Sequence, residues 1–237
     1  MKNMKKKLTI LTGAGISAES GLKTFRDSDG LWEEYSVMEV ASIEGWHSNP
    51  GLVLEFYNQR RRQLADAKPN KAHMILAELE EYFDVHIVTQ NVDNLHERAG
   101  STKVLHLHGE LTKVRSVRDE TLVEDIGYES IAMGQTGKDG AQLRPGIVWF
   151  GESVPLIAEA ERLVRQADIF AVVGSSLVVY PAAGLASAVR PEAKAFLVDP
   201  NDIEMRLPRN FVMIKEVATI GVAKMKEILL SDFTSDP

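Results

Sequence analysis

Short runs rich in β-branched residues recur along the chain, and amphipathic helical patterns lie between several of them. The runs cover residues 8–11, 85–89, 104–107, 147–150, 169–173, 195–198 and 211–214. Apolar positions follow helical spacing over residues 52–66, 71–82, 155–166 and 218–230. Nearly continuous apolar runs are typical of strands buried on both faces of a parallel sheet. The alternation therefore predicts an α/β fold, a Rossmann-like doubly wound parallel sheet.

Two stretches do not fit this alternation and predict a second, smaller domain that is helical or irregular. Residues 28–82 form a long helical excursion between the first two predicted strands, and residues 113–142 are polar, glycine-containing and without a clear core pattern. A loop of that length inside a compact domain usually belongs to a separate module or a lid. The larger, Rossmann-like domain is accordingly predicted to comprise residues 1–27, 83–112 and 143–237.

Charge and composition exclude several classes of protein. The 27 basic and 34 acidic residues give a net charge of −7, whereas a general nucleic-acid binder carries a basic surplus. The absence of cysteine excludes disulfides and thiolate zinc sites, and it suits a reducing cytoplasm. Residues 169–189 lack charge over the length of a membrane span, but glycines and Pro181 interrupt them. With no apolar leader after the charged N-terminus, we expect a cytoplasmic protein that binds neither nucleic acid nor membrane.

A glycine-rich turn follows the first predicted strand. Gly13, Ala14, Gly15 and Ser17 match the strand–turn–helix pattern in which glycines let the backbone approach a pyrophosphate at a helix N-terminus. A tight turn without a ligand would explain the glycines equally well. No strand with a terminal acidic residue arrives about 20 residues later, as in dehydrogenases. The turn therefore predicts dinucleotide binding but not hydride transfer.

The turn belongs to a larger set of motifs. Just downstream of it lie Ser20-Gly21 and Phe25-Arg26. Three further motifs each follow a predicted strand: Thr89-Gln90-Asn91-Val92-Asp93-Asn94-Leu95-His96, His108-Gly109 and Gly174-Ser175-Ser176-Leu177. Between the last two lies Val148-Trp149-Phe150-Gly151-Glu152. In this order and context the motifs resemble those of the sirtuins, and the resemblance spans roughly residues 8–200. It implies an NAD-consuming enzyme that removes acyl groups from lysine in proteins or peptides.

The resemblance also implies the reaction and its catalytic residues. The amide oxygen of acyl-lysine would attack the nicotinamide ribose carbon, and the products would be nicotinamide, deacylated lysine and an O-acyl-ADP-ribose. His108 would be the general base, since an imidazole titrates near working pH. Asn91 and Asp93 would position the nicotinamide carboxamide and the ribose, and Gln90 the ribose hydroxyls. Taken alone, His108 would more often be a structural histidine, a role that we expect for His106.

Further cofactor contacts follow from the same resemblance. Arg26 would meet a phosphate or ribose, and Phe25 would shield the reactive carbon from water. Gly174, Ser175 and Ser176 would cradle phosphate or ribose. Asp199 stands where many sirtuins have an asparagine that contacts the adenosine end of NAD.

Two groups of residues are predicted to bind the acyl-lysine. Its backbone would pair with Val148, Trp149 and Phe150 on one side and with the segment after Ser176 on the other. Tyr57 and Arg60 lie three apart on a predicted helix and so share one face. In the sirtuins this Tyr-x-x-Arg pair marks the class that removes succinyl and malonyl groups, whose carboxylate suits an arginine fork. Without the resemblance, residues 60–62 would be interpreted as a solvated helix surface.

Most sirtuins hold a structural zinc with two cysteine pairs, and this chain departs from that pattern. The matching positions carry Ser116, Asp119, Thr136 and Asp139, which are poor zinc ligands beside thiolates. We therefore predict no metal. Packing of apolar residues, together with backbone pairing, would have to replace the zinc, and the candidates for packing are Val117, Leu122, Ile126, Tyr128 and Ile131.

Two other functions are compatible with the same motifs. An ADP-ribosyltransferase or NAD hydrolase would keep the fold and change the acceptor, whereas a non-catalytic NAD-sensing module would bind NAD without releasing nicotinamide. The joint presence of Asn91, Asp93 and His108 favours catalysis over sensing. The oligomeric state is left open by the sequence.

Overall fold

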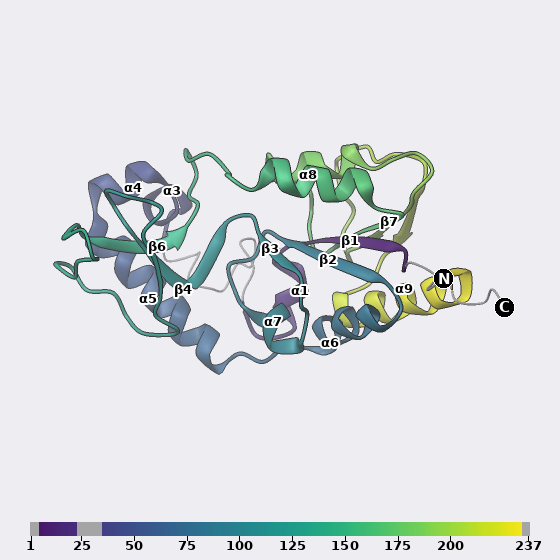
Figure 1. The fold of residues 1–237 in the computed structure, drawn as a ribbon, viewed down its shortest axis with the longest axis horizontal. Coiled ribbons are helices and arrows are strands. Elements are labelled where there is room, and N and C mark those ends of the chain that lie inside the picture. Colours follow the sequence, from purple (N-terminus) through teal and green to yellow (C-terminus); the bar gives the residue numbers. More distant parts are fainter. Residues whose placement is uncertain (1–4, 23–34, 234–237) are drawn as a thin grey trace.

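A computed structural model describes residues 5–22 and 35–233 (Figure 1). Its largest element is a six-stranded parallel sheet in the order β3-β2-β1-β7-β8-β9. The strands are β1 (Lys7–Thr12), β2 (Asp84–Thr89), β3 (Val104–His106), β7 (Ile169–Val173), β8 (Lys194–Val198) and β9 (Phe211–Ile214). This order is that of the Rossmann fold, in which the chain reverses direction across the sheet between β1 and β7. The predicted fold class is confirmed.

Helices cover both faces of this sheet, which explains why its central strands are apolar throughout. On one face, α6 (Lys71–Glu78), η1 (Leu79–Glu81) and α9 (Ala218–Phe233) pack into one hydrophobic core with α1 (Gly15–Ala18). On the other face, α8 (Ile157–Gln166) and η2 (Ala182–Ala188) pack into a second core. Figure 1 shows α8 above the sheet and α6 and α9 below it. In the part of the chain that the structure describes, no helix is both long and apolar enough to cross a membrane.

A smaller module lies beside the large sheet, on the left in Figure 1. It contains an antiparallel sheet in the order β5-β4-β6, formed by β5 (Val123–Asp125), β4 (Gly109–Ser116) and β6 (Leu143–Ile147). The helices α3 (Val37–Val40), α4 (Ile43–Ser48) and α5 (Pro50–Asp66) pack with it around a third core. The short helix α7 (Leu95–Ala99) follows β2 and contributes Leu95 to the same core.

Two predicted elements differ from the observed ones. The strand expected over residues 147–150 is instead β6, which ends at Ile147, because it pairs with β4 rather than with the large sheet. The helix α6 was assigned to the smaller domain with residues 28–82, yet its apolar face packs against the large sheet through Ala72, Ile75 and Leu76. The side chains of α6 thus favour a domain boundary before residue 71.

Buried polar side chains of α5 fasten the loop between β5 and β6. The Asn58 amide donates to the carbonyl oxygen of Ile131 and accepts from its N–H, both at 2.9 Å. The fully buried Arg61 donates from Nε to the carbonyl oxygen of Leu111 at 2.7 Å and from Nη1 to Asn58 Oδ1 at 2.9 Å. Burial lowers the pKa of Arg61 to about 10, so it stays charged at neutral pH. These bonds join the helix to both β4 and the glycine-containing loop.

Hydrogen bonds also connect the positions at which most sirtuins carry cysteine. Ser116 Oγ donates to Asp139 Oδ2 at 2.5 Å and accepts from the backbone N–H of Arg118 at 3.0 Å. Asp139 Oδ1 accepts from the N–H of Ala141. The predicted replacement by apolar packing is correct for Ile131, which is buried, but wrong for Val117 and Tyr128, which are exposed. Hydrogen bonds of Ser116 and Asp139 therefore stabilise this region together with the packing of Ile131.

We expect Asn58→Ala to lower the free energy of unfolding by about 2–4 kcal/mol. The substitution leaves the buried N–H and carbonyl of Ile131 unpaired, and each such loss costs about 1–3 kcal/mol. Urea unfolding followed by circular dichroism would measure the shift in midpoint at unchanged slope. Gln63→Ala, an exposed position on the same helix, is the control and should unfold like the wild type. An Asn58→Ala protein as stable as that control would contradict this account of the loop.

Candidate functional site

The predicted cofactor residues meet at the carboxyl ends of β1, β2 and β7, where the strand order reverses. The Gly13 N–H donates to the carbonyl oxygen of Val173, and the Gly15 N–H to that of Gly174, at 3.0 and 2.9 Å. The turn after β1 therefore lies directly against the turn after β7. In open α/β sheets this is the position at which ligands bind.

Close backbone approach explains the glycines of both turns. A Cβ atom added at Gly13 would lie 2.6 Å from the carbonyl oxygen of Gly174, and one added at Gly174 would lie 2.3 Å from the backbone nitrogen of Ile16. Gly174 also has a φ of +63°, which favours glycine. The contact between the turns thus requires glycine at Gly13 and Gly174. As a result, the backbone at the carboxyl ends of β1 and β7 carries no side chains at these two positions. Ala14 is exposed there, as a residue facing a ligand would be.

Asn91, Asp93 and Ser17 form one hydrogen-bonded cluster at this edge. The Asn91 amide donates to the carbonyl oxygen of Gly13 at 3.0 Å and to Ser17 Oγ at 3.2 Å. Ser17 Oγ donates to Asp93 Oδ2 at 2.9 Å, and Asp93 Oδ1 accepts from the N–H of Leu95. Asn91, Asp93 and Ser17 are all buried, and burial raises the pKa of Asp93 above its ordinary value. The cluster fixes an amide and a carboxyl group beside the glycine turn.

Gln90 connects this cluster to the turn after β7 and to His108. Its side-chain amide donates to Ser175 Oγ at 2.9 Å, and its carbonyl oxygen accepts from His108 Nδ1 at 3.0 Å. A carbonyl can only accept, so Nδ1 of His108 carries the hydrogen and Nε2 presents a lone pair. Burial lowers the pKa of His108, which keeps the ring neutral at working pH. The geometry gives His108 the tautomer that a general base needs.

His106 is held in a different way. Its Nε2 lies 2.7 Å from Glu97 Oε1, and its Nδ1 lies 3.2 Å from the carbonyl oxygen of Asn91. Burial alone would lower the pKa of His106, but the bond to Glu97 and the negative charge of that residue raise it overall. A ring engaged at both nitrogens cannot accept a further proton. The structural role predicted for His106 fits these contacts.

The Tyr57–Arg60 pair lies on α5, next to this site. The buried Tyr57 hydroxyl accepts a hydrogen bond from Trp149 Nε1 at 2.9 Å, and burial raises its pKa to about 12, so the phenol stays protonated. The half-buried guanidinium of Arg60 interacts electrostatically with both Tyr57 and Asp93. The arginine is therefore close enough to both the Tyr57 phenol and the buried Asp93 carboxyl group for its charge to act on each.

The backbone of residues 148–150 is not arranged as predicted. The N–H groups of Val148 and Trp149 donate to the His108 carbonyl and to Glu152 Oε2, and Phe150 exchanges both of its backbone bonds with Ala41 and Ile43. These groups are already paired, so they cannot form a free strand edge for a substrate. Backbone pairing with a substrate would have to use neighbouring groups. The predicted pairing therefore cannot use the N–H groups of these three residues, and otherwise it stays a prediction.

Four other predicted cofactor residues form no hydrogen bond with the cluster around Asn91 or lie outside the described residues. Phe25 and Arg26 lie outside the described residues. Asp199 is buried after β8, and its carboxylate accepts from the N–H of Asn201 at 2.9 Å, without a bond to the cluster around Asn91. Ser176 is half-buried beside Ser175 on the turn after β7.

Sequence reasoning missed a buried hydrogen-bonded chain behind the site. Thr12 Oγ1 donates to Thr89 Oγ1 at 2.8 Å, and Thr89 Oγ1 accepts from the N–H of Asn91 at 3.0 Å. His96 Nε2 lies 3.0 Å from Thr12 Oγ1. The two threonines end the adjacent strands β1 and β2, and their pairing supports the backbone of Asn91.

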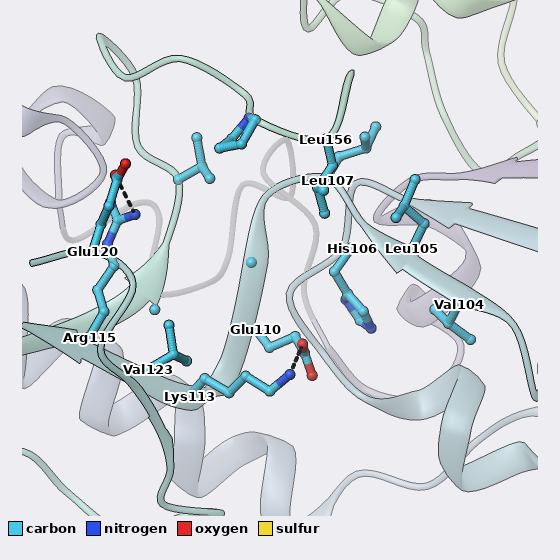
Figure 2. Close-up of a pocket in the computed structure, with 14 residues that line it drawn as sticks. Val104, Leu105, His106, Leu107, Glu110, Lys113, Arg115, Glu120, Val123 and Leu156 are labelled. Atoms are coloured by element: carbon cyan, nitrogen blue, oxygen red, sulfur yellow. Dashed lines mark hydrogen bonds and ion pairs between the residues drawn. The ribbon is translucent and has the colours of Figure 1, made fainter. Parts of the chain in front are cut away.

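A separate pocket of about 310 Å³ lies over β3 and β4. Figure 2 shows Leu105, Leu107 and Leu156 on its walls and two ion pairs at its rim, Lys113–Glu110 and Arg115–Glu120. His106 lines this pocket, whereas His108 is not among its lining residues. The pocket is therefore distinct from the cluster of predicted cofactor residues.

Comparison with known proteins relates the chain to one family. The model of the Sir2 family matches residues 13–181. The chain is 56% identical over 213 residues to an NAD-dependent protein deacylase of Helicobacter pylori, covering 90% of this chain and 93% of the relative. It is 51% identical over 230 residues to a protein of the same description from Bacteroides thetaiotaomicron, covering 95% of this chain and 98% of the relative.

Solved structures show the same relationship. A mutant Sir2 homologue in complex with ADP-ribose matches with a TM-score of 0.88 at 35% identity, covering 98% of this chain and 95% of that one. A Sir2 homologue in complex with NAD matches with a TM-score of 0.84 at 37% identity, covering 95% and 91%. The chain therefore belongs to the Sir2 family.

Proposed function

We propose that the chain removes succinyl and malonyl groups, as well as acetyl groups, from lysine in proteins. The enzyme is an NAD-dependent protein deacylase, and the proposed products are the deacylated lysine residue, nicotinamide and an O-acyl-ADP-ribose. Because the chain has no cysteine, it suits a reducing compartment, and we propose that it acts in the cytoplasm.

The position of Arg60 is the observation that supports acidic acyl groups most strongly. Its charge acts on both Tyr57 and Asp93. A carboxylate at the far end of an acyl chain would reach a guanidinium and a neutral phenol, while the amide end lies toward the cofactor. Arginine binds carboxylates through a planar fork, and such charge-assisted bonds are the stronger ones.

The residues at the strand ends fit a dinucleotide. The contact between the Gly13 and Gly174 turns leaves backbone without side chains, and Gln90, Asn91 and Ser175 offer amide and hydroxyl groups of the kind that bind ribose and carboxamide. When bound there, NAD supplies a scissile bond to nicotinamide and the ribose that takes the acyl group. Asn91 and Asp93 would hold the carboxamide and ribose, and Nε2 of His108 would accept the proton from a ribose hydroxyl.

The pH profile tests the assignment of His108 as the base. Because burial lowers the pKa of His108, the neutral form persists to lower pH than in a free imidazole. Activity should therefore be full above the folded-state pKa and fall as pH drops through it, with the acid limb of kcat/KM below about pH 6.5. Steady-state rates on a succinyl-lysine peptide from pH 5 to 9 would measure it. An acid limb well above pH 7 would speak against this histidine.

Product analysis distinguishes the proposed reaction from its rivals. Mass spectrometry of a reaction with succinyl-lysine peptide and NAD should show O-succinyl-ADP-ribose and desuccinylated peptide in equal amounts. ADP-ribose attached to protein would indicate a transferase, and free ADP-ribose without lysine product would indicate an NAD hydrolase. Binding of NAD without nicotinamide release would indicate a sensor.

A further inference from the structure

The hydroxyl group of Tyr57 has one hydrogen to donate, and its neighbours restrict where that hydrogen can point. Trp149 Nε1 donates to the phenol oxygen at 2.9 Å. An indole nitrogen is a donor only, so Tyr57 cannot donate to it. Among the described residues, the phenol donates to no other group. The Trp149 contact therefore fills an acceptor site of the oxygen and leaves the O–H available for a ligand.

The indole of Trp149 is held in place by contacts with Arg144 and Trp46. The guanidinium of Arg144 lies over the ring with its Cζ 3.5 Å from the centroid, and Trp46 stacks at 5.5 Å with a tilt of 33°. Arg144 and Trp149 are both buried, at 5% and 3% exposure. A cation at this distance from an aromatic face is attracted by the ring. The orientation of the donor N–H is thus set by packing before any ligand arrives.

Arg144 is itself fixed by the turn that carries Trp149. Its Nη1 and Nη2 donate to the two carboxylate oxygens of Glu152 at 2.8 and 2.9 Å, and Nη2 also donates to the carbonyl oxygen of Ile147 at 3.2 Å. Glu152 Oε2 also accepts from the backbone N–H of Trp149 at 2.9 Å. One arginine therefore closes the turn from Ile147 to Glu152 and stacks on the indole within it.

We propose that Trp149 is a specificity-determining residue for acidic acyl groups, held in position by Arg144. By donating to the Tyr57 oxygen, it directs the phenol O–H toward the carboxylate that Arg60 binds. A neutral acetyl group presents no carboxylate there, so it gains nothing from this arrangement. The inference rests on the proposed function of the Tyr57–Arg60 pocket and adds a residue that the Tyr-x-x-Arg motif does not contain.

The test compares kcat/KM on succinyl-lysine and acetyl-lysine peptides of the same sequence, with the ratio as the readout. Trp149→Phe keeps an aromatic ring in contact with Arg144 and Trp46 but removes the N–H. We expect it to lower the succinyl-to-acetyl ratio about tenfold, the scale of one hydrogen bond to a charged group. Tyr57→Phe should lower the ratio by a similar factor. The double variant should fall no further than Tyr57→Phe alone, because both changes remove the same directed bond.

Trp46→Phe is the matched control, since it makes the same change on the neighbouring indole, which has no bond to Tyr57. Its succinyl-to-acetyl ratio should stay at the wild-type value, and thermal unfolding of every variant would verify folding. Arg144→Lys keeps a charge beside Glu152 but loses the planar stack, and it should lower the ratio less than Trp149→Phe does. A merely structural role for Trp149 would lower both activities together and leave the ratio unchanged.

The variants distinguish a failure of the role of Trp149 from a failure of the proposed acyl pocket. If Arg60→Met lowers the ratio while Trp149→Phe does not, the role of Trp149 is overturned and the acyl pocket stands. Losses in the ratio that multiply in the Trp149→Phe, Tyr57→Phe double variant would also overturn it, since the two residues would then act independently. If Arg60→Met leaves the ratio unchanged, the acidic acyl pocket itself is wrong.

Discussion

Replacing His108 with alanine should lower kcat/KM for deacylation by about 10²–10⁴-fold, the usual contribution of a positioned general base. The ring is neutral, its Nδ1 hydrogen is committed to the Gln90 carbonyl, and Nε2 is left as the proton acceptor. Removing it should leave the cluster around Asn91 and Asp93 in place. Stopped assays of nicotinamide release and deacylated peptide would measure the loss.

His86→Ala provides the control for the loss of an imidazole, because His86 pairs with Asp84 at the amino end of β2, away from the carboxyl ends of the strands. It should keep near-wild-type activity. The alternative base is His106. If His106→Ala abolished turnover at normal stability while His108→Ala did not, the base would have to be reassigned, despite the bond between His106 and Glu97.

The substitution Arg60→Met should cost about 2–5 kcal/mol of transition-state stabilisation on succinyl-lysine peptides, the range for unpairing a buried charge. Methionine preserves much of the side-chain volume, so the loss reports the missing fork rather than a cavity. Turnover of acetyl-lysine peptides should suffer far less, because the acetyl group carries no charge. Measuring kcat/KM on both peptides gives the difference directly.

Arg62→Met is the matched control two residues along the same helix. Arg62 is exposed and pairs with Glu55 at the surface, where such pairs contribute little. Both peptides should be turned over at wild-type rates by this variant. Equal losses on succinyl-lysine and acetyl-lysine in Arg60→Met would defeat the assignment of the acyl pocket.

Local sequence pattern was sufficient for the large sheet and the cluster at its edge. Central strands buried on both faces have to be apolar throughout, so β7 begins and ends at the predicted residues. The edge strand β9 does so as well, although two of its four side chains are exposed. The residues that follow parallel strands converge at one edge of the sheet. Gln90 and Ser175, which the resemblance assigned to the cofactor, each follow such a strand, and they form a hydrogen bond.

The smaller module was less predictable because its stability depends on pairing between distant residues. The strands β4 and β6 pair across a long polar loop, and neither has a local pattern that reveals its partner. Arg61 is flanked by arginines and resembles a solvated residue, yet it is fully buried because the Leu111 carbonyl and Asn58 meet its donors. Such partners come from the fold and cannot be read from neighbouring positions.

The most direct test of the account is nicotinamide release with succinyl-, malonyl- and acetyl-lysine peptides side by side, in wild type and in His108→Ala. The account predicts that the wild type releases nicotinamide only with a peptide present, in equal amount to the deacylated peptide, and faster with the acidic acyl groups. The variant should lose this release almost completely. Release that is independent of peptide, or that is retained without the imidazole, would contradict it.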